Sequence, residues 1–307
     1  MRGHCPLRTS LPGGLREVTE RTLQHMLRLQ YSHVMSAAPA LNLSALSHAL
    51  GDWACRFDAD LLDECDSTNG VLLARTEAGA PSGAVVIAAA QTAGRGRRGR
   101  PWISTPGDSL TFSLLWRFAP GTRPAGLSLA AGLAVAEALE KVGAGRTASN
   151  GTSRNPGTAI QLKWPNDLLL GGRKLGGILV ELLPGAPHVA VIGIGLNLRL
   201  PAALPDALQA QSAALDHGGD PNELLAGILV ELLAVLDSFA ASGFADLRSA
   251  WMARHAFADA PIRLLADFAP PRMGICRGVD VDGALLLEVS GQIERVLSGE
   301  VSLRSAA

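Results

Sequence analysis

The sequence predicts an α+β fold, in which a mixed, largely antiparallel sheet is flanked by helices and followed by a small all-β unit. Two short apolar runs, at residues 84–90 and 110–116, have the length and composition of buried strands. Two more runs, at residues 177–183 and 188–194, flank the turn sequence Pro-Gly-Ala-Pro and predict a hairpin, which pairs its strands antiparallel. After Pro261 the pattern changes to short strands alone.

The helices are predicted by apolar spacing and by one capping sequence. Between residues 127 and 142, apolar side chains recur at helical intervals: Leu127, Ala131, Val135, Ala138 and Val142. A second helix begins after Asp220, since Pro221 suits the first helical position and Glu223 the first turn. We expect it to bury Leu224, Leu225, Ile228, Leu232 and Leu236. The strands of the tail are expected at residues 262–266, 274–279, 284–289 and 301–303.

We expect three parts along the chain: an N-terminal extension over residues 1–60, a large unit over 61–258 and a small β unit over 259–307. The extension could form one amphipathic helix at residues 15–34, but no second helix or winged region follows that would complete a helix-turn-helix module. Residues 143–160, rich in Gly, Ser, Thr and Asn, predict a mobile surface loop.

The composition indicates a compact soluble protein. Hydrophobic residues make up 48% and charged residues 18% of the 307 residues, which argues against disorder. The net charge of -1 provides no general attraction to nucleic acid or anionic membranes, so anion recognition must be local. Arginines near the N-terminus exclude a secretory signal, and Glu231 and Asp237 interrupt the most apolar stretch, at 224–239. We therefore expect a cytoplasmic protein.

The cysteines and histidines suggest no metal site. Cys5, Cys55, Cys65 and Cys276 lack Cys-x-x-Cys spacing and histidine partners, so they are expected to be reduced, buried thiols. The seven histidines form no metal-binding or catalytic-triad pattern.

A glycine-spaced arginine segment, residues 94–102, is suited to holding an anion. Its sequence is Gly-Arg-Gly-Arg-Arg-Gly-Arg-Pro-Trp. Glycines allow backbone N–H groups to converge on an anion, and the arginines add permanently charged donors. We expect mutual repulsion to keep this loop mobile until an anion arrives, with Trp102 covering a planar or apolar ligand. A solvated basic turn or an RNA-binding tract would have the same composition.

A second segment carries two of the three lysines in the chain, Lys163 and Lys174. Lys163-Trp-Pro-Asn-Asp167 leads into an apolar strand, which turns at two glycines before Arg173 and Lys174. A hairpin here would bring Lys174 close to Asp167 at one end of a sheet. Lysine, asparagine and aspartate together suit phosphate, ribose and a divalent cation or an incoming amine. Each residue alone would more often be a packing or turn residue.

Six strings in the chain resemble those of biotin–protein ligases, in the order found in that family. They lie at residues 66–69, 91–102, 163–167, 174–181, 193–197 and 299–304. The resemblance covers residues 61–303 and implies a class II synthetase-like catalytic domain at 61–258 with an SH3-like β-barrel at 259–307. It implies that ATP activates biotin to biotinyl-5'-AMP, with release of pyrophosphate, and that biotin is then transferred to a lysine of a biotin carboxyl carrier protein.

The resemblance also assigns roles to individual residues. The biotin head would lie against Ser67, Thr68, Asn69, Gln91, Gly177, Gly193 and Gly195. Arg95 and Arg97, held by Gly94 and Gly96, would meet carboxylate and phosphates, beside Lys163 and Asn166. Lys174 would bridge the biotin carboxylate and the α-phosphate, and Asp167 would position or deprotonate the acceptor lysine. Trp102 and Asn197 are candidates for the adenine side. Mg²⁺ would arrive on ATP without a dedicated protein site.

Three alternatives remain. A lipoate or octanoate ligase shares the fold and chemistry but matches the arginine string and the lysine segment less well. A bifunctional ligase–repressor would need a DNA reader within residues 1–60, where the family's winged helix is not recognisable. A nucleic-acid-binding module would rest on the arginine loop alone and predicts RNA affinity that depends steeply on salt. Ligases of this type also form homodimers through sheet edges, and the sequence leaves the oligomeric state open.

Overall fold

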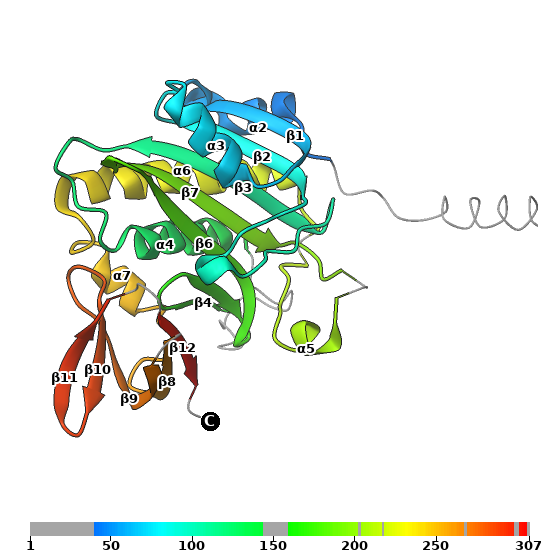
Figure 1. Ribbon diagram of the computed structural model, residues 1–307. Coiled ribbons are helices and arrows are strands. Elements are labelled where there is room, and N and C mark those ends of the chain that lie inside the picture. Colours follow the sequence, from blue (N-terminus) through cyan, green and yellow to red (C-terminus); the bar gives the residue numbers. More distant parts are fainter. Residues whose placement is uncertain are drawn as a thin grey trace, which may run out of the picture. The chain divides into compact units, whose positions relative to one another are not determined.

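The structure, a computed structural model, describes residues 40–143, 159–201, 204–216, 218–266, 269–297 and 301–305 (Figure 1). The chain divides into two compact units, Met1–Ala37 and Ala38–Ala307, and all the described residues belong to the second. The helix expected at residues 15–34 and the loop expected at 143–160 lie, apart from residues 143, 159 and 160, outside the described residues.

The described elements follow one another as helices and strands of moderate length. In chain order they are α2 (Leu43–Leu50), η1 (Gly51–Arg56), β1 (Asp58–Cys65), α3 (Thr68–Glu77), β2 (Ala84–Gln91), η2 (Arg97–Gly99), β3 (Ser109–Arg117), α4 (Leu127–Lys141), β4 (Ile160–Lys163), β5 (Asp167–Leu170), β6 (Arg173–Leu183), β7 (Ala186–Asn197), α5 (Asp206–Gln209), α6 (Pro221–Ser242), α7 (Arg248–Met252), β8 (Pro261–Ala266), β9 (Ala269–Val279), β10 (Leu285–Val289), β11 (Gln292–Val296) and β12 (Val301–Ser305).

The larger sheet has seven strands in the order β1-β2-β3-β7-β6-β5-β4. Only β1 and β2 run parallel, and every other neighbouring pair is antiparallel. This confirms the predicted mixed, largely antiparallel sheet. The strands expected at 84–90 and 110–116 are β2 and β3, and the expected hairpin is β6–β7, which turns at Pro184 and Gly185.

Helices cover both faces of this sheet (Figure 1). Helices α4 and α6 pack on each other and on one face, and together with the sheet they enclose the main apolar core. Helix α3 packs on the other face, over β2, β3 and β7, around Leu72. Each leucine removed from water in such a core contributes about 1.5–3 kcal/mol, so the long buried face of α6 is a major source of stability.

Helix α6 begins as predicted, because the Asp220 side chain accepts a hydrogen bond from the Asn222 backbone N–H and Pro221 occupies the first turn. All five leucine and isoleucine side chains expected to be buried on it are buried. Among the described helices, α6 alone has the length and apolar composition to cross a membrane, despite Glu231 and Asp237. Because α6 packs against α4, its apolar composition is that of a helix in the protein core.

The second sheet is antiparallel, with five strands in the order β11-β10-β9-β8-β12. Four of its strands were predicted, and β11 was not. Contacts between this unit and the preceding part of the chain include the Trp164 Nε1 hydrogen bond to the Gly283 carbonyl, at 3.1 Å, and the approach of His255 Nε2, after α7, to Cys276 Sγ, at 3.1 Å. Contrary to expectation, Cys55 is exposed and Cys65 is half-buried, whereas Cys276 is buried.

Candidate active site

A cavity of about 160 Å³ lies between the face of the large sheet that carries α3 and the arginine loop at 94–102. Its floor is a row of residues that face one another on four neighbouring strands: Thr111, Gly195, Gly177 and Asp167. The two central residues carry no side chain. The Trp102 ring lies over Gly195, and the free space of the floor is at Gly177, between this ring and Asp167.

Three glycines on β6 and β7 differ in the space that they leave for neighbouring side chains. A Cβ on Gly195 would lie 2.4 Å from Cε2 of Trp102, and a Cβ on Gly193 would lie 2.2 Å from Oδ1 of Asn69. A Cβ on Gly177 would meet the end of Lys174, at 3.5 Å, and the Asn166 carbonyl oxygen, at 3.8 Å, both ordinary contact distances. Gly193 and Gly195 thus admit Asn69 and Trp102 into the site, while Gly177 leaves free space over the floor.

The arginine loop is a closed turn with hydrogen bonds at its base. The Trp102 backbone N–H donates to Gly94 at 2.8 Å and the Gly96 N–H donates to Arg100 at 2.7 Å. Arg98 has a left-handed backbone with φ of 59°, an uncommon conformation for a residue with a side chain. A Cβ on Gly94 would lie 2.4 Å from the Trp102 carbonyl oxygen, so only glycine fits where the loop closes.

One carboxylate holds both lysines of the second segment. Asp167 Oδ1 lies 2.7 Å from Lys174 Nζ, and Asp167 Oδ2 lies 3.1 Å from Lys163 Nζ. The predicted proximity of Lys174 and Asp167 is confirmed. Burial alone would raise the pKa of Asp167, but the two ammonium groups outweigh burial and hold this pKa below its usual value. Burial lowers the pKa of Lys163 despite its contact with Asp167.

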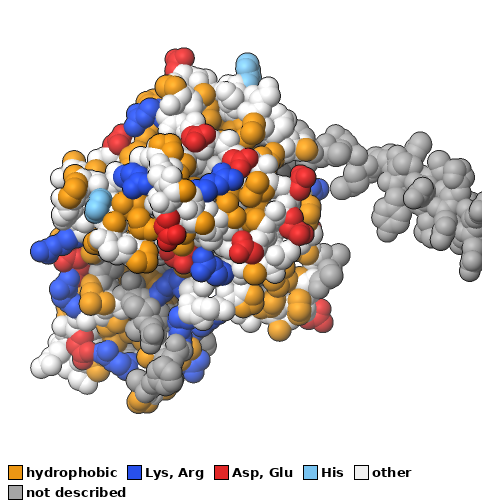
Figure 2. Space-filling view, turned by 45° about the horizontal axis from the view of Figure 1, so that its top comes forward, with side chains coloured by type: hydrophobic (Ala, Val, Ile, Leu, Met, Phe, Trp, Pro, Cys, Tyr) orange, Lys and Arg blue, Asp and Glu red, His pale blue; other side chains and the backbone are white. Residues whose placement is uncertain are grey.

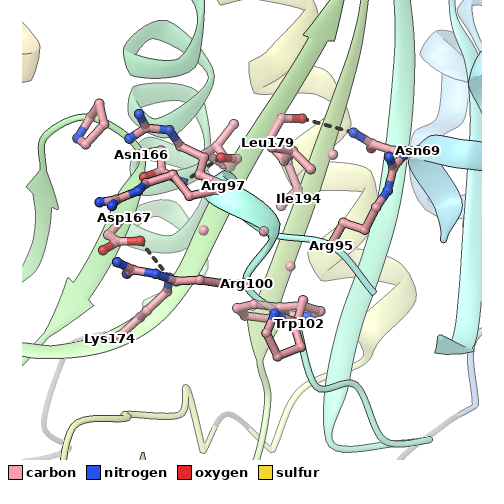
Figure 3. Close-up of a pocket in the computed structure, with 18 of the residues that line it drawn as sticks. Asn69, Arg95, Arg97, Arg100, Trp102, Asn166, Asp167, Lys174, Leu179 and Ile194 are labelled. Atoms are coloured by element: carbon pink, nitrogen blue, oxygen red, sulfur yellow. Dashed lines mark hydrogen bonds and ion pairs between the residues drawn. The ribbon is translucent and has the colours of Figure 1, made fainter. Parts of the chain in front are cut away.

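Cations gather at this end of the cavity (Figure 3). Arg97 and Arg100 of the arginine loop and Lys174 of β6 line it, and Arg304 lines it from β12 of the small sheet. Burial, followed by the field of neighbouring arginines, lowers the pKa of Arg304, and burial lowers that of Arg97. Several partly desolvated cations with one carboxylate among them form a site for a multiply charged anion.

The opposite end of the cavity is polar but carries few charges. Gln91 Oε1 accepts hydrogen bonds from the Thr68 backbone N–H at 2.7 Å and from its hydroxyl at 3.2 Å. The Ser113 hydroxyl lies within hydrogen-bond distance of Thr68 Oγ1 and Asn69 Oδ1. These contacts fix the first turn of α3 against β2 and β3, so that Ser67, Thr68, Asn69 and Gln91 line the cavity together.

Arg95 lies apart from the cationic end, although it belongs to the same loop. Its guanidinium donates to Glu181 Oε2 at 3.1 Å, and the same oxygen accepts from Asn69 Nδ2 at 2.7 Å. Figure 3 shows Arg95 beside Asn69, across the pocket from Arg97, Asp167 and Lys174. The structure thus separates Arg95 from Arg97, which the sequence interpretation had placed on the same anions.

Of the predicted site residues, all but Gly94 and Asn197 line this cavity. Asn197 lies at the end of β7, where its amide donates to the carbonyls of Ala213, at 3.0 Å, and Lys174, at 3.5 Å. It therefore fixes backbone near Lys174, and its candidate role on the adenine side stays a prediction. The lining residues that sequence reasoning did not assign are Arg98, Arg100, Pro101, Thr111, Trp164, Pro165, Ile178, Leu179, Ile194, Leu303 and Arg304.

Within the described residues, no group of three His, Cys, Asp or Glu side chains could hold a metal ion. The carboxylate that lines the cavity, Asp167, is already paired with two ammonium groups. The donor set fits a metal that arrives with a phosphate ligand better than one held by the protein.

On the face seen in Figure 2, acidic and basic side chains are interspersed, in keeping with the net charge of -1.

Comparisons with known proteins agree with this geometry. Residues 62–197 match the Biotin/lipoate A/B protein ligase family, and residues 273–304 match the Biotin protein ligase C terminal domain. The bifunctional ligase/repressor BirA of Escherichia coli is 40% identical over 252 residues, covering 80% of this chain and 74% of that protein. The biotin–[acetyl-CoA-carboxylase] ligase of Paracoccus denitrificans is 35% identical, covering 74% of this chain and 92% of that protein.

Among solved structures, the biotin protein ligase from Aquifex aeolicus in complex with biotin and ATP is similar to this chain, with a TM-score of 0.68 and 28% identity. The match covers 81% of this chain and 99% of that one.

Proposed function

We propose, from the premise that this chain belongs to the biotin/lipoate A/B protein ligase family, that its cavity carries out both steps of protein biotinylation. The chain is an ATP-dependent biotin–protein ligase. The observation that carries this conclusion is the division of one cavity into a neutral polar end and a cationic end, joined by a floor of glycines.

In the first step, a carboxylate oxygen of biotin attacks the α-phosphorus of ATP, and pyrophosphate leaves. The neutral end, formed by Ser67, Thr68, Asn69 and Gln91, suits the ureido ring, which offers both donors and an acceptor. Lys174 faces the point where negative charge develops, and Arg97, Arg100 and Arg304 face the phosphates. One preorganised donor of this kind contributes about 2.7–4 kcal/mol in other enzymes.

In the second step, the amine of an acceptor lysine attacks the acyl carbon, and AMP leaves. We propose that the acceptor is the lysine of a biotin carboxyl carrier protein. Asp167 carries a low pKa and two ion pairs, which makes it a weak base. Its role in our proposal is to position Lys174 and Lys163. Closure of the arginine loop over the intermediate would exclude water, which otherwise hydrolyses an acyl-adenylate.

We further propose that Mg²⁺ enters bound to the phosphates of ATP, and that copies of the chain can pair as homodimers. The BirA protein is named a ligase and a repressor, and we propose the ligase activity alone for this chain. In the described residues before β1, helix α2 packs on α6, and Asn42 is tied to Asn222, which indicates a structural role.

The test is incubation with biotin, ATP, Mg²⁺ and a purified carrier domain, followed by intact mass measurement. We expect the carrier to gain one biotinyl group only when ATP is present, and we expect exchange of pyrophosphate into ATP to depend on biotin. Replacement of biotin by lipoate should give neither signal. Lipoylation of a carrier domain instead would contradict the assignment, as would failure to form an adenylate from biotin.

A further inference from the structure

Thr111 carries a buried hydroxyl without a hydrogen-bond partner. Its side chain lies on β3 and is 4% exposed, and its Oγ1 atom has no partner within the described part of the chain. Buried hydroxyls are normally paired, because removing one from water without a replacement partner costs free energy. Thr76, which is equally buried, donates to the Leu72 carbonyl at 2.7 Å. The unpaired hydroxyl of Thr111 therefore requires a physical explanation, whereas the paired hydroxyl of Thr76 does not.

A second unpaired polar atom lies beside it. Nε1 of Trp102 is also buried and has no partner among the described residues. Thr111 faces Gly195 across the β3–β7 pair, and a Cβ on Gly195 would lie 2.8 Å from Trp102 Nε1. Directly opposed residues have Cβ atoms about 4.5–5.5 Å apart, so the indole N–H lies over the residue that is the direct cross-strand neighbour of Thr111. Both residues line the cavity.

Thr111 lies at the neutral polar end of the cavity. Asp167, which anchors both lysines, lies three strands away along the same row, or roughly 14 Å at the usual spacing of about 4.8 Å. Ser113, two residues further along β3, already contacts Thr68 and Asn69. Trp102 lies where the two halves meet, because Lys174 Nζ is 5.9 Å from its ring centroid.

We propose that Thr111 is a specificity-determining residue for the carboxylic acid substrate. Its hydroxyl, next to the Trp102 indole N–H, forms a hydrogen bond with an uncharged polar atom of the bound acid's ring system. The inference rests on the proposed function, since that function makes the acid biotin. It adds a polar contact made from the floor of the site, beyond those of the α3 turn and Gln91.

The test compares Thr111→Val, which replaces the hydroxyl by a methyl group of similar size, with Thr111→Ser, which keeps a hydroxyl. Thr76→Val is the matched control, because it makes the same change at a buried threonine outside the cavity. Biotin and ATP are titrated separately by calorimetry. We expect Thr111→Val to bind biotin about threefold to tenfold more weakly, as for the loss of one neutral hydrogen bond, with unchanged ATP affinity. Thr111→Ser should stay within about twofold of the wild type.

Thermal unfolding of the ligand-free protein gives an independent readout. Thr111→Val removes an unpaired buried hydroxyl, so its Tm should rise, whereas Thr76→Val removes a satisfied hydroxyl, so its Tm should fall. Wild-type biotin affinity in Thr111→Val would overturn the inference, and so would a loss confined to ATP. If Thr111→Val does not fold, Thr111→Ala is titrated in its place against the same criteria. A wild-type protein that binds no biotin would instead refute the proposed function.

Discussion

Lys174 is fixed through its backbone as well as through its side chain. Its N–H donates to Gln211 at 2.8 Å, and its carbonyl accepts from Ala213 at 2.7 Å. The amide of Asn197 donates to the same segment, and Asp167 holds the ammonium group. A point charge held in this way needs little reorganisation when negative charge develops beside it.

Replacement of Lys174 by Ala should lower the rate of biotin-dependent pyrophosphate exchange by a factor on the order of 10²–10³, because a preorganised cation is lost. Lys141→Ala is the control, because Lys141 is exposed, pairs with Glu231 of α6 and does not line the cavity. Equal exchange rates in Lys174→Ala and the wild type would remove Lys174 from the chemistry.

Asp167 makes a pH-dependent contribution to stability whose sign follows from its pKa. Its folded pKa lies below the usual value of 3.8, since the two lysines outweigh burial. A lowered carboxyl pKa stabilises the folded protein above the unfolded pKa, and this contribution is lost as the pH falls through the folded value. We expect Asp167→Asn to lower the free energy of unfolding by about 1–3 kcal/mol at pH 7. In urea titrations this difference should shrink below about pH 4; a constant difference down to pH 3 would contradict it.

At the scale of elements, the floor of the site depends on strand register. Thr111, Gly195, Gly177 and Asp167 come from β3, β7, β6 and β5, and they form one row only because these strands pair in this register. A shift by one residue would turn each side chain to the other face of the sheet.

Two alanine substitutions in this row should have different effects. Gly195→Ala places a methyl group against the Trp102 ring, so we expect the ligand-free protein to lose about 1–3 kcal/mol of stability. Gly177→Ala makes only ordinary contacts, with the flexible end of Lys174 and the Asn166 carbonyl, so its ligand-free stability should be near that of the wild type while biotin binding weakens. Chemical denaturation and calorimetry measure the two effects. Similar stability losses in both variants would contradict this account of the floor.

Local sequence patterns predicted the helices and strands whose apolar residues are the buried ones. The apolar runs of β2 and β3, the periodic helix α4 and the capped helix α6 all formed where expected. Strand β1 was not predicted, because its sequence, Asp-Ala-Asp-Leu-Leu-Asp-Glu-Cys, is rich in acids, which are uncommon in strands. The partner of Arg95 was also not predicted. Glu181 lies 86 residues away, and only the packing of the loop over β6 brings the two together.

At the scale of the whole molecule, the small sheet completes the cavity. Leu303 and Arg304 of β12 line it, and Trp164, beside Lys163, donates to Gly283 in the turn before β10. Leu303 and Arg304, from the predicted string at 299–304, therefore lie at one site with the string at 163–167. The division of the chain at residue 259 stays a prediction.

Arg304→Ala should weaken ATP binding by about tenfold and leave biotin binding unchanged, because Arg304 lies at the cationic end. Arg263→Ala is a matched control: Arg263 is the cross-strand partner of Arg304 in the β12–β8 pair, but it is exposed and does not line the cavity. Titration of each nucleotide-free variant with ATP measures the effect. Equal ATP affinities for the two variants would show that the small sheet does not serve the nucleotide.

The outermost strand of the large sheet, β1, carries Asp58, Asp60, Asp63 and Glu64. An edge strand presents unpaired N–H and C=O groups to any other chain that approaches. If two copies paired through β1, rows of carboxylates would come close together. Their electrostatic repulsion would oppose dimerisation most strongly at low ionic strength. Self-association through this strand should therefore increase with ionic strength, which distinguishes it from contacts made elsewhere on the molecule.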